Sequence, residues 1–182
     1  MKIKSSELIE DLLLRTAVAS NAVSRLRTLD SAALNFKRAP EQWSILECIE
    51  HLNRYGNFYL PEIENQILAQ QTASGNPVFK SGIIGNYFVN LMLVGNGNVK
   101  KMKTAASMNP LHSKLSDLTL AKFLKQQDRL TTLLQQAAQV DLVKTKTAIT
   151  LSPMIRLRLG DTLRFLVAHI ERHVRQAEKT QY

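Results

Sequence analysis

Four long stretches with the apolar periodicity of a helix dominate the sequence, and helix breakers separate them. They cover residues 5–29, 44–70, 116–140 and 161–179. Apolar residues recur in each stretch at intervals close to three or four, so one face of each helix needs a partner to cover it. Signals for a β-sheet are few. The sequence therefore predicts an all-α fold in which four helices form a bundle.

The connections between these helices differ greatly in length. Residues 71–115 form a long connection between the second and third helices, and within it residues 84–93 predict one short helix. A connection of this length is usually functional or irregular. Residues 145–159 form a second connection, which carries a β-branched run and then Pro153. After it, Asp161 is placed to cap the N-terminus of the last helix.

The histidines have the most informative placement of any residue type in the chain. There are four in 182 residues, and His169 and His173 lie one helical turn apart in the last predicted helix. Residues at positions i and i+4 point the same way from a helix. His51 lies in the second helix, and a helical projection places all three imidazoles at the edge of the apolar faces. The same projection places Asn53 and Arg164 on solvated faces.

Three imidazoles arranged in this way can form a metal site. Two neutral imidazoles on one helix face, with one donor from a neighbouring helix, can hold a divalent transition metal and leave coordination positions open. The alternative is that the histidines are solvated or packed in the core, because the spacing H-x-x-x-H is common. Both interpretations stay open from the residues alone.

Other polar side chains lie within one turn of the histidines. Glu47 precedes His51 by one turn and could act as a general base or orient His51, or be a surface carboxylate. Tyr55 follows His51 by one turn and could donate from its phenol to a ligand, or pack in the core. Gln176 could bond a ligand or a neighbouring helix.

Composition limits the partners of the chain. The length fits one domain covering residues 1–182, and 24 lysines and arginines against 15 acidic residues give a formal charge of +9. This surplus suits an anionic partner or an evenly basic surface. Because the basic residues are scattered and not interleaved with aromatic ones, we do not expect nucleic acid to be the partner.

Cysteine content and hydropathy predict the compartment. Cys48 is the single cysteine, which excludes an internal disulfide and fits a reducing compartment, and we interpret it as a small core residue. The first residues become acidic at Glu7 and lack the continuous apolar run that is typical of a signal peptide. The apolar patch at residues 83–94 is too short to span a bilayer. We therefore expect a cytoplasmic protein that does not bind a membrane.

Two motifs resemble those of a known family. The segment from Trp43 to Leu52, WSILECIEHL, resembles the W-S-x-x-x-x-x-x-H-L signature of the DinB superfamily, which includes bacillithiol-transferase-like proteins. Residues 160–176 resemble the closing pattern G-[DS]-x-L-x-x-x-x-x-H-x-x-x-H-x-x-Q of that family. The order also matches, with one histidine on the second helix and two on the last. The resemblance covers nearly the whole chain.

The resemblance implies a bundle in an up-down-down-up-like arrangement with a divalent metal, most often nickel or zinc. It maps the metal ligands to His51, His169 and His173, and it implies a homodimer. Characterised members resemble thiol-dependent S-transferases, so we expect an S-transferase that joins a low-molecular-weight thiol to a small-molecule electrophile. An open metal position would favour the thiolate form of that thiol. The alternatives are a metal-dependent hydrolase and a non-enzymatic bundle that binds metal or nucleic acid.

Overall fold

The computed structural model describes residues 1–70, 75–93 and 104–180. The part of the chain that it describes is mostly helical, as predicted, and it also contains two short two-stranded ribbons. In chain order the elements are β1 (Lys2–Lys4), α1 (Ser5–Leu26), α2 (Ser31–Asn35), α3 (Ile45–Leu68), β2 (Val78–Lys80), α4 (Ile83–Met92), the 3-10 helix η1 (Ala106–Met108), α5 (Leu118–Ala137), β3 (Lys146–Ile149), β4 (Ser152–Arg158) and α6 (Leu159–Thr180).

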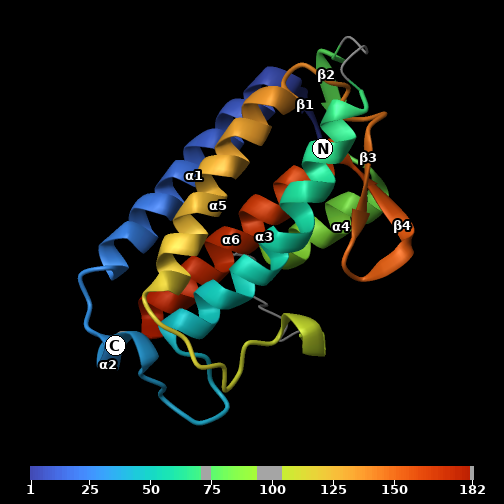
Figure 1. The fold of residues 1–182 in the computed structure, drawn as a ribbon. Coiled ribbons are helices and arrows are strands. Elements are labelled where there is room, and N and C mark those ends of the chain that lie inside the picture. The colour runs from blue at the N-terminus through green and yellow to red at the C-terminus, as the bar shows by residue number, and fades with distance from the viewer. Residues whose placement is uncertain (71–74, 94–103, 181–182) are drawn as a thin grey trace.

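The four long helices pack around one hydrophobic core. α1 contacts α5 and α6, and α3 contacts the same two helices, so the four form a ring in which α1 and α3 are opposite each other. α1 and α6 run in one direction and α3 and α5 in the other (Figure 1). Leu12, Ile49, Phe123 and Leu163 show how each helix contributes fully buried side chains to this core. These buried faces follow the helical periodicity of the sequence.

The start of α3 is fixed by a capping box. The Ser44 hydroxyl accepts a hydrogen bond from the Glu47 amide, and the Glu47 carboxylate accepts one from the Ser44 amide. This exchange satisfies two amide groups that the first turn of a helix leaves without partners. α3 then continues through Pro61 to Leu68. His51 therefore lies in the second turn of a helix whose start is well anchored.

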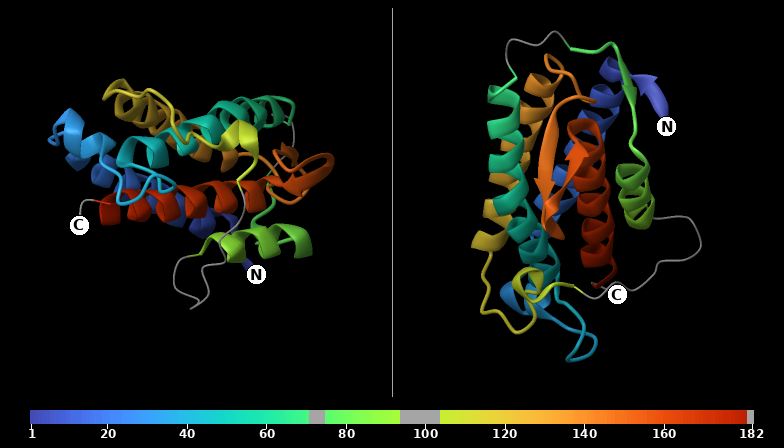
Figure 2. Two further views of the ribbon diagram at one scale, coloured as in Figure 1. Left: turned by 90° about the horizontal axis from the view of Figure 1, so that it is seen from below. Right: turned by 90° about the vertical axis from the view of Figure 1, so that its right-hand side faces the viewer.

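The segment before α6 adds strands that the sequence did not predict to the mostly helical fold. Residues 146–158 form an antiparallel hairpin, β3–β4, with a register irregularity between Ala148 and Ile149. The hairpin contacts α3 through β3 and α6 through both strands, and α4 packs along α6 (Figure 2). β1 and β2 form the second ribbon, which ties the N-terminus to the segment before α4. The predicted short helix at 84–93 is confirmed as α4.

Asp161 does not cap the last helix, contrary to the sequence prediction. α6 begins at Leu159, so Asp161 lies within its first turn, and the residue is fully buried. Its carboxylate accepts hydrogen bonds from the Ser81 hydroxyl, the Gly82 amide and the Arg164 guanidinium. A Cβ atom at Gly85 would come within 2.4 Å of the Asp161 side chain. The carboxylate thus joins the start of α4 to α6, and this contact needs glycine at position 85.

Candidate metal centre

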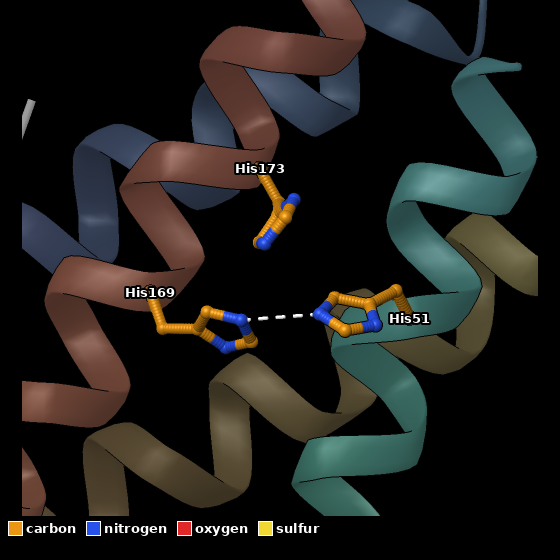
Figure 3. A group of neighbouring side chains, drawn as sticks. All are labelled: His51, His169 and His173. Atoms are coloured by element: carbon orange, nitrogen blue, oxygen red, sulfur yellow. Dashed lines mark hydrogen bonds between the residues drawn. The ribbon is translucent and has the colours of Figure 1, made fainter. Parts of the chain in front are cut away.

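The three predicted histidines meet between α3 and α6. One ring nitrogen from each of His51, His169 and His173 lies within 4.8 Å of the other two. The Nε2 atoms of His51 and His169 are 3.1 Å apart, and all three rings point into the space between the two helices (Figure 3). His51 and His169 are buried and His173 is half-buried. The i, i+4 spacing on α6 therefore produces the cluster that the sequence suggested.

Hydrogen bonds orient two of the three rings. Nδ1 of His51 lies 2.7 Å from the Met108 carbonyl oxygen, which can only accept, so this nitrogen carries the proton. Nδ1 of His173 lies 2.9 Å from Oε1 of Gln176, again an acceptor. Each contact leaves Nε2 unprotonated, and Nε2 of His51 is within hydrogen-bond distance of Nε2 of His169. Histidines that bind metals usually donate their other N–H to a partner of this kind.

The distance between two of the ring nitrogens fits a common ion. Two imidazole nitrogens that bind one zinc or nickel ion at about 2.1 Å lie about 3 to 3.4 Å apart for angles between octahedral and tetrahedral. The 3.1 Å between Nε2 of His51 and Nε2 of His169 falls in this interval. Nδ1 of His169 is buried and has no hydrogen-bond partner among the described residues. The donor set, three nitrogens without a carboxylate or thiolate, suits a borderline transition metal.

The protonation of the cluster also suits metal binding, because a ligating histidine must be neutral. Burial lowers the pKa of His51 to about 4 and that of His173 to about 3. Burial, followed by the charges of the two neighbouring histidines and Arg172, holds the pKa of His169 well below its ordinary value. All three imidazoles are consequently neutral at pH 7.

Aromatic rings pack against the histidines and limit their rotation. The Trp43 ring centroid lies 4.7 Å from that of His51 and 5.7 Å from that of His173. The Tyr55 ring lies 4.3 Å from His169, and the Phe165 ring is stacked on His169 at 5.6 Å with an interplanar angle of 8°. Donors held in this way lose little additional freedom when they bind an ion.

The Glu47 carboxylate is occupied outside the cluster. One oxygen accepts hydrogen bonds from the Lys37 ammonium and the His112 amide, and the other completes the capping box with Ser44. These contacts support a positioning role at the start of α3, and a role as general base stays a prediction. Cys48 is buried, and desolvation raises the pKa of its thiol to about 12, which agrees with its interpretation as a core residue.

A cavity of about 110 Å³ opens on the histidines. Tyr55 lines it, and Gln176 contacts His173 and lines a neighbouring hollow, so a ligand-binding role for either residue stays a prediction. Sequence reasoning missed the walls contributed by Met108 of η1 and by Thr150 in the β3–β4 turn. The β-branched run before Thr150 was the available signal for that turn.

The fold and the site define a class: a helical bundle that gathers three neutral histidines beside a cavity. The family model of the DinB superfamily matches residues 16–177, and the chain belongs to this superfamily. Neither the curated proteins nor the solved structures contain a significant match to the chain. No helix in the described ranges is long and apolar enough to cross a membrane.

Proposed function

We propose that the protein binds one divalent metal ion, nickel or zinc, through His51, His169 and His173 and acts as a metal-dependent thiol S-transferase. The observation that carries this proposal is the convergence of three neutral imidazoles beside a cavity, and within the described part of the chain no fourth protein ligand joins them. Three protein ligands leave room for a small molecule at the ion, which is the usual design of a catalytic site.

The chain's own residues would bind and orient the reactants. The Met108 carbonyl and the Gln176 amide oxygen hold two imidazoles with Nε2 toward the shared space. Met92, Met108 and Leu151 supply apolar surface that limits water in the cavity. The Tyr55 phenol stays protonated, since burial raises its pKa, and it can donate a hydrogen bond to a bound substrate.

The bound ion supplies Lewis acidity, which favours the thiolate form of a thiol in its vicinity. In the transfer, the sulfur of a low-molecular-weight thiol forms a bond to an electrophilic carbon, the bond from that carbon to its leaving group breaks, and the thiol proton is released. Hydrolysis would use the same cavity with water as the nucleophile, so the two reactions are separated by experiment. The homodimer and the cytoplasmic location stay predictions.

The test uses purified full-length protein loaded with zinc or nickel and the same protein stripped of metal. A panel of thiols (cysteine, glutathione and mercaptosuccinate) is combined with 1-chloro-2,4-dinitrobenzene, and product formation is measured. We expect metal-dependent turnover that His173→Ala abolishes. His112→Asn is the matched control, because His112 is exposed and asparagine tolerates its φ of 64°. Metal binding without turnover of any thiol, together with metal-dependent hydrolysis of 4-nitrophenyl acetate, would replace the transferase proposal with hydrolysis.

A further inference from the structure

A second, larger hollow lies against the outer side of His173. It has a volume of about 500 Å³ and is lined by the loop before α3 and by the last turns of α6. We call it the α6 groove; Arg38, Trp43, Arg172, His173, Gln176 and Lys179 are among its walls. Arg172 and His173 also line the smaller cavity that opens on the three histidines. A molecule in the α6 groove therefore reaches the edge of the candidate metal centre.

The charge of the α6 groove is mainly positive. Among the described residues that line it, Arg38, Arg172 and Lys179 are cationic and Glu41 alone carries a carboxylate. The Arg38 guanidinium donates a hydrogen bond to the Lys179 carbonyl, and a neutral acceptor does not cancel a cationic charge. Across residues 1–70, 75–93 and 104–180, no ion pair includes Arg38 or Lys179. A hollow lined by one sign of charge attracts the opposite sign.

The end of α6 offers a second explanation for two of these cations. Helix carbonyls at a C-terminus favour nearby positive charge, and Lys179 and the Arg38–Lys179 contact both lie at that end. Arg172 lies about two turns before the helix end, at the junction of the groove and the histidine cavity. Its place at that junction is not explained by the helix terminus, and it extends the positive surface to the histidines.

We infer that the α6 groove binds the anionic part, a carboxylate or phosphate, of a small substrate whose reactive end lies at the three histidines. Guanidinium groups suit both anions, because their paired N–H donors match two oxygens. The assignment of the reactive end rests on the proposed function. Binding of the anionic part does not, because Arg38 and Lys179 lie outside the histidine cluster.

The experiment measures anion binding directly, with metal-free and zinc-loaded full-length protein. Equilibrium dialysis with labelled succinate gives the affinity, with succinamide as a neutral analogue of similar size and inorganic phosphate as the second anion. Emission from Trp43, the single tryptophan, reports whether binding occurs in this groove. We expect the metal-free protein to bind succinate more tightly than it binds succinamide. The affinity for succinate should fall as salt is added. Tighter binding of phosphate than of succinate would assign the phosphate class.

Two double variants with the same change in net charge locate the site. Arg38→Gln/Lys179→Gln removes two cations from the groove, and we expect it to weaken succinate binding by at least about fivefold. Lys122→Gln/Lys125→Gln removes two exposed cations from α5, and this variant should change the affinity for succinate by less than about twofold. Equal losses in both variants, or equal affinities for succinate and succinamide, would overturn the inference. Succinate binding that persists while the metal-dependent reaction is absent would uphold the groove and reject the proposed function.

Discussion

The Nε2 atoms of His51 and His169 lie 3.1 Å apart, although 118 residues separate the two histidines in the chain. His51 reaches this position from the second turn of α3, and His169 from the middle of α6. The contact therefore depends on how α3 packs against α6, and the same packing brings His173 to the cluster. Two neutral imidazoles this close can share one proton in a hydrogen bond, and a metal ion in place of that proton would bind both nitrogens.

Gln176 is expected to tune metal affinity through His173. Its amide oxygen accepts the proton of His173 Nδ1, which fixes the tautomer that leaves Nε2 available. Gln176→Ala should weaken zinc affinity by about tenfold, and Gln176→Glu should retain it, because a carboxylate is an equally good acceptor. Zinc titrations in competition with a chelator measure this. Gln135→Ala, at an exposed position on α5, is the control. An unchanged affinity in Gln176→Ala would contradict the positioning role.

Acidification should destabilise the metal-free protein over a defined range. The pKa of His51 is lowered from about 6.5 when unfolded to about 4 when folded, and that of His173 to about 3, so the unfolded chain binds more protons between these values. The free energy of unfolding should stay level above pH 6.5 and fall by at least about 1 kcal/mol by pH 5.

Urea unfolding at a series of pH values measures this dependence, with His51→Gln as the comparison. The variant should show a shallower fall, because one of the groups responsible is removed. A slope below pH 6.5 that is identical in the two proteins would show that His51 is not buried in its neutral form. In zinc-loaded protein we expect metal retention at pH 6, since protons compete for these nitrogens only at lower pH.

The histidines show how much of the site could be predicted from the sequence alone. The i, i+4 spacing of His169 and His173 and the edge position of His51 needed only helical geometry, so the cluster and the four long helices could be predicted. The i, i+4 rule holds in any helix, whatever the packing. Only the structure shows the distance between α3 and α6 and the acceptors that Met108 and Gln176 offer to His51 and His173.

The parts that could not be predicted depend on partners distant in sequence. A helical projection places Asn53 and Arg164 on solvated faces, whereas both are buried in the structure, at 0% and 8% exposure. Asn53 donates to the Thr119 carbonyl on α5, and Arg164 pairs with Asp161 beneath α4. A helical projection contains neither neighbour, because it describes one helix at a time. For Arg164, the long connection that carries α4 also shows no periodicity that fixes where it packs.

Asp161 and Arg164 should show energetic coupling. Their ion pair is almost fully buried, and Asp161 also accepts hydrogen bonds from Ser81 and Gly82. Asp161→Ala should lower the free energy of unfolding by about 3 kcal/mol, because it leaves the Arg164 charge buried without its partner. Asp161→Ala/Arg164→Met should cost less than the sum of the single changes. Strict additivity in this double-mutant cycle would show that the pair does not act as a unit.

The most direct test of the account is the metal content and coordination of protein purified without an affinity tag. Elemental analysis should find about one nickel or zinc ion per chain, and X-ray absorption should find imidazole nitrogens at about 2.0–2.1 Å. His51→Ala, His169→Ala and His173→Ala should each lower metal affinity at least about tenfold, while His112→Asn retains it. Protein that binds no divalent metal, or that binds it equally well in all four variants, would contradict the three-histidine site.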